Sequence, residues 1–432
     1  VVEHEDAVIR AADHLVEIGP GRGEQGGHLI YSGPVTPLLS RKKSTLTGDY
    51  LSGKKSVFTS RTPRTPTGWL TVENTTENNL KNLTVNFPIG VLTCVTGVSG
   101  SGKSTLVHQV LYRNLALLKG VECEETPGAC ARILGADSIS TVVLADQSPL
   151  ARTPRSSPAL YLGVFDTIRD LFSKTPEAKA RGLTPGSFSF NTGNGRCERC
   201  SGSGFEKIEM QFLSDIHVRC PECEGRRYQQ FIRNIKLSNL SIDEVLDLTV
   251  TEAIEFLKPL TQASAILPLI TLQEVGLGYL HLGQPLNSLS GGESQRIKLV
   301  ERLLQKSSSH SLLILDEPTT GLHADDITLL LTALQRLVDK GHSVIIIEHN
   351  IDVIQSADYI IDLGPEAGTE GGCIVATGTP DQISANAASI TGQFFRHHGY
   401  VSPVAAEKPS AYKSKTHADI YISGARHHNL KN

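Results

Sequence analysis

Short apolar runs alternate with amphipathic stretches along most of the chain, and each run is followed by a polar or glycine-rich turn. Runs rich in β-branched residues are typical of buried strands, and the stretches between them carry the apolar spacing of helices. The strand-like runs are residues 91–96, 141–144, 311–315 and 343–347. Strands and helices in alternation predict a mixed α/β fold.

The two ends of the chain repeat sequences from its middle. Residues 1–27 align with residues 346–372 at a constant offset of 345, so that the Glu-His, Gly-Pro and Gly-Gly pairs of the two segments coincide. Residues 46–48 match residues 390–392 at an offset of 344, one residue less than before. Residues 429–432 match residues 79–82. We expect the end of one repeat, one complete repeat and the first strand of a third, with the chain starting inside a strand. A longer tandem array and joined pieces both remain open.

Composition and charge exclude few classes of protein. With 432 residues the chain exceeds one average domain, so we expect a large domain with insertions or flanking pieces. No apolar run approaches the roughly 20 residues that span a bilayer, and no signal-peptide pattern opens the chain. We therefore expect a cytoplasmic protein with no membrane partner. The net charge of −4 gives no general attraction to nucleic acid, so a DNA-binding surface would have to be local.

A glycine-rich loop follows the first strand-like run and leads directly into a helical pattern. Backbone N–H groups of such a loop can wrap phosphates, because glycine allows close approach, and the helix N-terminus adds a favourable partial charge. Lys103 is placed to reach the β- and γ-phosphates, and the Ser104 hydroxyl to ligate Mg²⁺. The motif predicts an ATP site made by Gly97, Ser99, Gly100, Ser101, Gly102, Lys103, Ser104 and Thr105.

Candidate catalytic residues follow the other three strand-like runs. Asp316 fits the carboxylate that holds the Mg²⁺ shell, and Glu317 fits a base that orients and deprotonates the attacking water. A strand that ends in Asp-Glu is common surface chemistry, but this one lies downstream of a phosphate-binding loop. His349 could hydrogen-bond the γ-phosphate, although a lone histidine is more often incidental. Gln147 is a weaker candidate for contact with Mg²⁺ and the water.

The sequence LSGGESQR at residues 289–296 opens another helical pattern, at Ser290, Gly291, Gly292 and Glu293. Two glycines behind a serine at a helix start form a second anion-binding nest. This is the signature sequence of ATP-binding-cassette ATPases, and a helix with an ordinary N-cap is the alternative. In that class the signature of one cassette closes over the nucleotide of another. We therefore expect a homodimer or a neighbouring cassette repeat as partner.

The interval between loop and signature is long, with 185 residues between Ser104 and Ser290. It contains two C-x-x-C pairs separated by nineteen residues, which suit a tetrahedral zinc site and a reduced compartment. Free thiols or redox chemistry are the alternatives; structural zinc is favoured because catalysis needs an open ligand position. The four other cysteines show no such pairing and are expected to be buried or free thiols. The expected zinc ligands are Cys197, Cys200, Cys220 and Cys223.

Longer stretches around these motifs resemble the excinuclease A family. They are FSFNTGNGRCERCSGSGFEKIEMQFLSDIHVRCPECEGRRY, ADQSPLARTPRSSPALYLGVFDTIRDLF, LSGGESQRIKL and LLILDEPTTGLHADDI, and they look like the second cassette half with its zinc-hairpin module. The resemblance covers nearly the whole chain. It implies a DNA-damage-recognition ATPase of nucleotide excision repair that uses ATP, Mg²⁺ and Zn²⁺, binds double-stranded DNA and works with the excinuclease B subunit. The domains that bind that subunit belong to a first cassette, which we do not expect here.

The resemblance divides the chain into five segments. Residues 69–383 would form a complete cassette, with an insertion at about 150–285 that carries a helical signature subdomain and a zinc module at 190–230. Residues 1–40 would be the tail of a preceding cassette, and residues 419–432 the first strand of a following one. Two segments rich in small and polar residues would be linkers, with local order possible around their Thr-Gly motifs: 41–68 and 384–418.

Basic residues are slightly in excess around the cysteine pairs. Residues 181–233 hold eight Lys or Arg and six Asp or Glu, and a solvated mixed face would explain this equally well. If the hairpin approaches a duplex, phosphate contacts would position it without reading sequence, and damage would be sensed through DNA shape. The candidate contacts are Arg196, Arg199, Lys207, Arg219, Arg226 and Arg227.

Two other functions stay open at the level of sequence. A paralogue of the same architecture could confer drug self-resistance, and nothing in these residues separates it from a repair protein. The ATPase of a membrane transporter would need membrane-spanning partners and no zinc, which the cysteine pairs disfavour.

Overall fold

The computed structural model describes residues 1–21, 26–40, 43–57, 62–121, 123, 125–146, 150, 155–208, 216–304 and 310–398. The chain divides into two compact units, one made of residues 1–146 and 307–432 and the other of residues 147–306. The mixed α/β fold expected from the sequence is confirmed. No helix in the described ranges is long and apolar enough to cross a bilayer.

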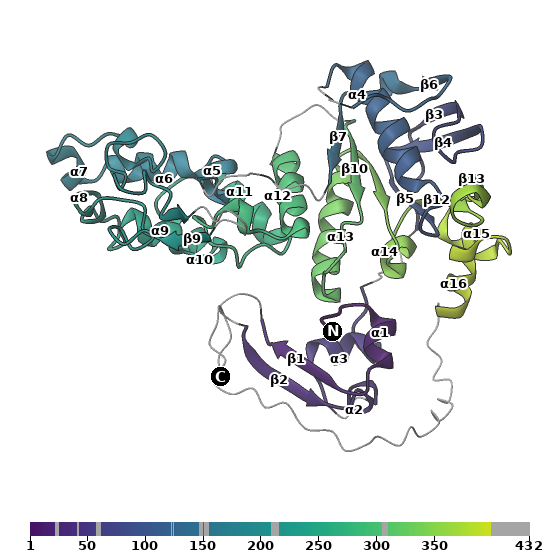
Figure 1. Cartoon of the computed structure of the whole chain (residues 1–432), viewed down its shortest axis with the longest axis horizontal. Coiled ribbons are helices and arrows are strands. Elements are labelled where there is room, and N and C mark those ends of the chain that lie inside the picture. Colours follow the sequence, from purple (N-terminus) through teal and green to yellow (C-terminus); the bar gives the residue numbers. More distant parts are fainter. Residues whose placement is uncertain are drawn as a thin grey trace. The chain divides into compact units, whose positions relative to one another are not determined.

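A six-stranded sheet forms the centre of the first unit (Figure 1). All of its neighbouring strands are parallel except the antiparallel pair at one edge, β12 and β13. The central strands are continuous apolar runs because both faces of the sheet are covered. In spatial order the strands are β13 (Cys373–Gly378), β12 (Tyr359–Gly364), β5 (Leu92–Gly97), β11 (Ser343–Ile347), β10 (Leu312–Asp316) and β7 (Val142–Ala145).

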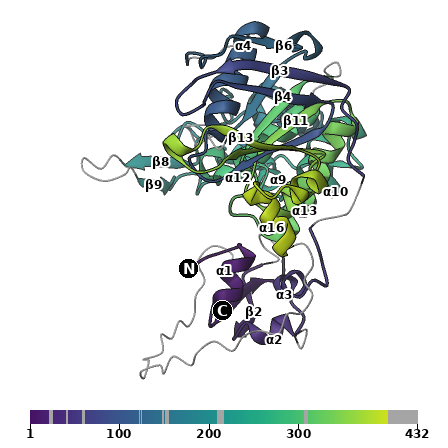
Figure 2. The ribbon, with the colours of Figure 1, turned by 90° about the vertical axis from the view of Figure 1, so that its right-hand side faces the viewer.

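Helices and a second sheet cover this central sheet. The π-helical segment η2 (Thr105–Tyr112), continued by α4 (Arg113–Lys119), buries Leu106 and Val110 in a core shared with β10 and β11. Figure 2 shows the three-stranded antiparallel sheet that adds to this core, in the order β4 (Leu83–Ile89), β3 (Gly68–Thr75) and β6 (Arg132–Leu134). The remaining elements are α13 (Ala324–Asp339), which contacts β5 and β11, with α14 (Ile351–Gln355), α15 (Pro380–Ala385), α16 (Ile390–His398), η3 (Ala136–Ser138) and η6 (Gly368–Glu370).

The N-terminal segment repeats the end of the cassette in three dimensions. Its strands β1 (Leu15–Gly19) and β2 (His28–Gly33) pair antiparallel with an irregularity between Glu17 and Ile18. The pair β12–β13 has the same irregularity 345 residues later, between Asp362 and Leu363. The helices are α1 (Asp6–Ala11), the counterpart of α14, then α2 (Thr36–Leu39) and α3 (Leu46–Leu51), the counterpart of α16. Residues 1–5 form no strand, so the expectation that the chain starts inside one is wrong.

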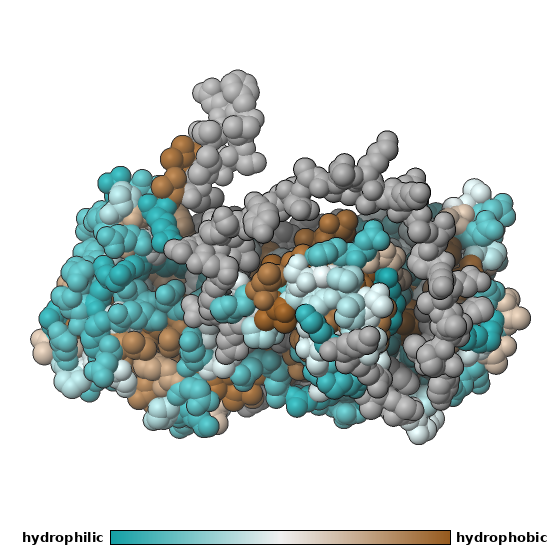
Figure 3. Space-filling view, turned by 90° about the horizontal axis from the view of Figure 1, so that it is seen from below, coloured by the Kyte–Doolittle hydropathy of each residue, from teal (hydrophilic) through white to brown (hydrophobic). Residues whose placement is uncertain are grey.

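Burial separates the two copies of the repeat. Val16 and Ile18 on β1 are 57% and 56% exposed, whereas their counterparts on β12, Ile361 and Leu363, are 0% and 2% exposed. The reason is that β12 lies between β5 and β13 and packs on the η2 core, while β1 pairs only with β2 among the described residues. Figure 3, which views the molecule from below, shows exposed hydrophobic atoms in brown near the centre of the picture.

Two segments expected as linkers contain helices. In the segment 41–68, Thr45 caps α3 by accepting a hydrogen bond from the Gly48 N–H. In the segment 384–418, α16 begins after Ser389, whose hydroxyl donates to the buried Asp362. The order allowed around the Thr-Gly motifs is therefore helical. The strand expected at residues 419–432 lies outside the described residues.

The second unit is mainly helical, with one short two-stranded arm, β8–β9, visible in Figure 2. Its core contains pairs of aromatic rings in tilted contact, such as Phe165 with Phe190 and Phe172 with Phe188. Its elements are α5 (Pro158–Tyr161), α6 (Val164–Ser173), α7 (Pro176–Ala180), η4 (Pro185–Phe188), β8 (Phe205–Ile208), β9 (Ile216–Arg219), α8 (Gln230–Arg233), α9 (Ile242–Asp247), α10 (Val250–Leu257), α11 (Ala263–Glu274), η5 (Leu286–Ser288) and α12 (Gly291–Leu304).

Candidate nucleotide site and cysteine cluster

The glycine-rich loop follows β5 and leads into the η2 helix, in the order the sequence predicted. Gly97, the last residue of β5, has φ +133°, and a Cβ there would lie 2.1 Å from the Leu363 carbonyl oxygen. No residue with a side chain fits at this position. The Asn79 amide donates to the carbonyl oxygens of Gly100 and Gly368, each at 3.1 Å, and so holds the outer part of the loop.

Lys103 is folded back over the loop. Its Nζ donates to the carbonyl oxygens of Gly97 at 2.8 Å and Val98 at 2.9 Å. Burial lowers the pKa of this ammonium, and the neighbouring carboxylates of Glu317 and Asp316 oppose that effect. The cation is therefore held beside the loop that the phosphates would enter, while Ser99, Gly100 and Ser104 are exposed.

The predicted acids lie at the same edge of the sheet as the loop. β10 and β5 both flank β11 in parallel, so their carboxyl ends meet at one edge. Asp316 ends β10, and its Oδ2 lies 3.4 Å from the Nε2 of His108 on η2. Burial raises the pKa of the Asp316 carboxyl and lowers the pKa of the His108 imidazole. Sequence reasoning missed His108, because a histidine inside a helix carries no motif.

Glu317 and His349 face each other across the end of β11. The distance from His349 Nε2 to Glu317 Oε1 is 3.5 Å, and the Glu317 N–H donates to the Ile347 carbonyl at 2.9 Å. Glu317 has φ +43°, a left-handed conformation that is uncommon for residues other than glycine. Burial lowers the pKa of His349, with a further lowering from Lys103, so the imidazole is neutral near pH 7.

Behind this pair lies a buried carboxylate that the sequence did not single out. Glu348 is 2% exposed and accepts hydrogen bonds from the Thr319 hydroxyl at 2.6 Å and the Thr319 N–H at 3.0 Å. Its other oxygen accepts from the N–H groups of His349 at 2.9 Å and Asn350 at 3.1 Å. Through Glu348, these bonds connect the loop after Glu317 to the backbone of His349. Burial raises the pKa of the Glu348 carboxyl.

The structure thus brings Lys103, Asp316, Glu317 and His349 together, and the helix start at Thr105 adjoins them. Gln147 lies outside the described residues. The signature residues belong to the other unit, at the start of α12. There the Ser290 hydroxyl accepts from the Glu293 N–H at 3.2 Å, and the Glu293 carboxylate accepts from the Ser290 N–H at 2.7 Å.

This reciprocal pair is a capping box, so the ordinary N-cap alternative describes the local geometry correctly. It does not exclude an anion, because Gly291 and Gly292 remain only partly buried.

The four cysteines of the two C-x-x-C pairs converge in the second unit. All four are buried, and their sulfur atoms lie within 4.8 Å of one another. The Sγ–Sγ distance is 3.9 Å between Cys197 and Cys220 and 3.6 Å between Cys200 and Cys223. Four thiolates at about 2.3 Å from a central Zn²⁺ have sulfur atoms about 3.8 Å apart in a tetrahedron. The donor set and its spacing therefore fit zinc.

Each C-x-x-C turn is followed by left-handed residues. They are Ser201 and Gly202 after the first turn, and Glu224 and Gly225 after the second. The backbone then folds back on the sulfurs, and the Gly204 N–H donates to the Cys200 sulfur at 3.3 Å. Such N–H···S bonds fix thiolate orientation around a metal.

The candidate DNA-contacting arginines differ in exposure. Arg219 and Arg199 are exposed, and Arg199 pairs with Glu206; Arg226 is 47% exposed and lies 3.7 Å from Asp243. The side chain of Lys207 lies outside the described part of the chain.

Two of the candidates donate hydrogen bonds to backbone carbonyls. Arg196 donates to the Asn191 carbonyl at 2.5 Å. Arg227 is 6% exposed, donates to the Gly283 carbonyl at 2.8 Å and lies over the Phe190 ring, 4.7 Å from its centroid. The prediction that Arg227 contacts DNA is therefore wrong for this structure, because Gly283 and Phe190 enclose its side chain. Both residues are far in sequence from the C-x-x-C pair next to Arg227, so the motif did not indicate this burial.

The sequence and the fold of this chain are similar to those of known proteins. No family model matches the chain. The UvrABC system protein A of Clostridium tetani is 51% identical over 397 residues, which are 92% of this chain and 42% of that protein. That of Methanothermobacter thermautotrophicus is also 51% identical, over 92% of this chain and 41% of that protein. The crystal structure of UvrA2 from Deinococcus radiodurans matches with a TM-score of 0.85 at 45% identity, over 92% of this chain and 48% of that one.

The chain thus spans about two fifths of the length of the curated relatives it matches. The resemblance to excinuclease A inferred from the motifs is confirmed at half of the aligned positions. Over the aligned nine tenths of its residues, this chain belongs to the family of UvrABC system protein A.

Proposed function

We propose that this chain is the ATP-hydrolysing cassette of a DNA-damage-recognition protein of nucleotide excision repair. The observation that carries the proposal is the convergence of Lys103, Asp316, Glu317 and His349 at one sheet edge. The high identity to UvrABC system protein A supports the repair context. The protein would act in the cytoplasm, where chromosomal DNA is repaired.

The residues at the sheet edge have distinct parts in the proposed reaction. Loop amides from Gly97 to Thr105 would bind the β- and γ-phosphates, with Lys103 turning from its carbonyl partners to the γ-phosphate. The Asp316 carboxylate and the Ser104 hydroxyl fit the oxygen ligands that Mg²⁺ prefers, and Mg²⁺ would neutralise phosphate charge.

Water activation falls to the Glu317 and His349 pair. Glu317 would accept the proton of the attacking water. The neutral His349, held at 3.5 Å from that carboxylate, would donate a hydrogen bond to the γ-phosphate and register its loss. Gln147 would orient the same water.

We further propose that the cassette works in a pair. The signature residues Ser290, Gly291, Gly292 and Glu293 would close over a nucleotide bound to another cassette. Residues 1–40 would be the tail of a preceding cassette, because β1 and β2 repeat β12 and β13 but expose Val16 and Ile18. In a complete cassette a phosphate-loop strand and helix cover the positions equivalent to these two residues. A neighbouring repeat is therefore the favoured partner, and a homodimer is the other form.

The second unit would hold zinc and meet DNA. Zn²⁺ bound by Cys197, Cys200, Cys220 and Cys223 would supply a structural cross-link at the base of the β8–β9 arm. Arg199, Arg219 and Arg226 would contact phosphates of double-stranded DNA, with Arg196 and Lys207 as further candidates. Loading of an excinuclease B subunit would require regions of the relatives beyond those that this chain matches.

Two substitutions test the ATPase proposal. Glu317→Gln should lower the turnover of Mg-ATP by about 100-fold or more while nucleotide affinity is retained, because only proton transfer is lost. Lys103→Ala should lose nucleotide binding itself, measured with a fluorescent ATP analogue. Glu255→Gln, which neutralises an exposed carboxylate on α10, is the matched control. Normal turnover in Glu317→Gln would overturn the assignment of the base.

A second pair of measurements tests the DNA surface. Arg226→Ala should weaken binding to damaged duplex and flatten the dependence of affinity on salt by about one ion. Arg181→Ala, an exposed arginine paired with Glu177 on α7, is the control. An unchanged salt dependence in Arg226→Ala would remove that residue from the DNA surface.

A further inference from the structure

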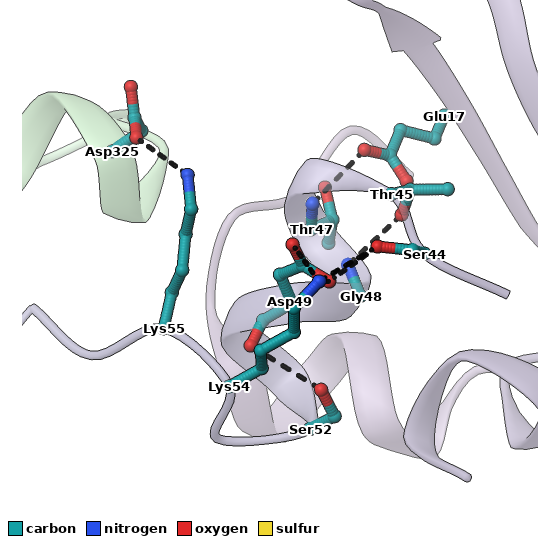
Figure 4. Close-up of polar contacts among 10 residues, drawn as sticks. All are labelled: Glu17, Ser44, Thr45, Thr47, Gly48, Asp49, Ser52, Lys54, Lys55 and Asp325. Atoms are coloured by element: carbon teal, nitrogen blue, oxygen red, sulfur yellow. Dashed lines mark hydrogen bonds and ion pairs between the residues drawn. The ribbon is translucent and has the colours of Figure 1, made fainter. Parts of the chain in front are cut away.

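The N-terminal segment contacts the cassette at the residues that follow Glu317 in sequence. The Tyr50 hydroxyl of α3 donates to Asp325 Oδ1 at 3.1 Å, and the Thr47 hydroxyl lies 3.2 Å from His323 Nε2. The Tyr50 and His323 rings meet edge to face, with centroids 5.8 Å apart. Lys55 adds a positive charge 3.9 Å from Asp325 (Figure 4).

α3 presents these groups because its own first turn is fixed. Figure 4 shows Thr45 capping the helix at Gly48, and Ser44 and Lys54 bound to Asp49. The Thr47 N–H donates to Glu17 of β1 at 3.1 Å, which ties the helix to the strand pair. The surface that meets His323 is therefore part of the folded repeat.

His323 has its protonation and orientation determined by two partners. Its Nδ1 accepts the Asp325 N–H at 3.2 Å and so caps the first turn of α13. With Nδ1 as the acceptor, the hydrogen is on Nε2, which donates to the Thr47 hydroxyl. One neutral ring thus joins the start of α13 to α3.

The loop between Glu317 and His323 is short and fastened at both ends. The Thr320 N–H donates to the Glu317 carbonyl at 3.2 Å, and the Leu322 N–H to the Thr319 carbonyl at 3.0 Å. Thr319 is bound to the buried Glu348. The other end of the loop is His323, so two consecutive turns connect this ring to Glu317.

We propose that α3 and the first turn of α13 form a junction between cassette repeats, in which His323 is a positioning residue for the loop that carries Glu317. The inference rests on the proposed function in taking Glu317 as the base. It goes further because it states that the tail of one repeat, through α3, positions the loop that carries Glu317 in the next repeat. The equivalent of Tyr50 in the other copy of the repeat is Phe394, 344 residues later on α16, with 52% of its surface exposed.

Amide hydrogen exchange of the first turn of α13 tests the junction without any catalysis. In the full 432-residue chain, Tyr50→Ala should speed exchange at Asp326 and Ile327, whose N–H groups bond the His323 carbonyl, by about tenfold. This is the size expected for losing one hydrogen bond to a charged group. Phe394→Ala, the matched change in the other repeat copy, should leave exchange there unchanged. Unchanged exchange in Tyr50→Ala would overturn the junction.

Conservative variants separate docking from capping. His323→Asn retains a good N-cap but loses the ring, so it should keep exchange at Asp326 slow and should reduce the effect of Tyr50→Ala to the part that comes from the hydrogen bond between Tyr50 and Asp325. Independent, additive effects of the two substitutions would contradict a shared contact.

Hydrolysis gives the second readout. Tyr50→Ala should lower kcat about tenfold with KM unchanged, because only the position of Glu317 shifts. Unchanged kcat with faster exchange would leave the contact real but refute His323 as a positioning residue. If the parent chain shows no turnover while exchange responds as expected, the proposed ATPase function fails and the junction stands.

Discussion

Removal of metal from the cysteine cluster should unfold the zinc module and free four thiols. The four cysteines are buried, and the two Sγ–Sγ distances, 3.6 and 3.9 Å, lie on either side of the roughly 3.8 Å expected around zinc. Binding to such sites is worth about 10–16 kcal/mol in small zinc peptides. That is comparable to the total stability of an ordinary domain, about 5–15 kcal/mol, so the module should not remain folded after chelation.

Thiol titration tests this prediction by counting the cysteines that react before and after chelation. The chain has eight cysteines, of which four lie in the cluster and Cys94 is fully buried, so a thiol reagent can reach the other three in the native protein. These are Cys123, Cys130 and Cys373. A strong chelator should raise the count from three to seven and release one zinc per chain. Cys123→Ser, an exposed control, should lower the native count by one and leave the zinc content unchanged.

The opposite result is equally clear. If the protein purified under reducing conditions contains no metal, and seven thiols react before any chelator is added, the four cysteines do not hold zinc. Cys220→Ser should then behave like Cys123→Ser, with no loss of helical content by circular dichroism.

Three further outcomes follow from single contacts. Gly97→Ala should destabilise the first unit by at least about 2 kcal/mol and abolish nucleotide binding, because its Cβ would overlap a carbonyl oxygen of β12. Gly120→Ala, also at positive φ but with open space, should cost only about 1 kcal/mol and keep nucleotide binding; equal losses would contradict the clash. Arg64→Ala should cost about 3 kcal/mol in urea unfolding, because it breaks the ion pair between Arg64 and the buried Asp358 carboxylate; a loss below about 1 kcal/mol would contradict this.

Burial lowers the pKa of His323 in the folded protein below its ordinary value of about 6.5. As pH falls below 6.5, the unfolded chain therefore binds a proton at this histidine more readily than the folded protein does, and this favours unfolding. Its contribution to stability is present above pH 6.5 and is lost as pH falls. Urea unfolding at pH 7, 6 and 5 should therefore show a steeper decline for the parent than for His323→Asn, and parallel curves would refute it.

Much of the fold was predictable because buried parallel strands leave a local mark. The run at 343–347 coincides with β11, and the other three strand-like runs are each within one residue of a strand. Strand order could not be predicted, since nothing in β5 itself indicates that β11 and β12 flank it. Helices α3 and α16 were hidden inside expected linkers. They are short, and bonds to Glu17 and Asp362 from distant strands stabilise them.

The sequence by itself determined which chemistry this protein carries. A phosphate loop, a signature and two C-x-x-C pairs each place their functional atoms within a few consecutive residues, so their residue types and spacing are sufficient. The tertiary structure alone decided which side chains meet. The contact of His108 with Asp316, the burial of Arg227 and the junction of Tyr50 with His323 join residues far apart in the chain. Such contacts depend on how strands and helices pack, and that packing is a property of the whole chain rather than of any local pattern.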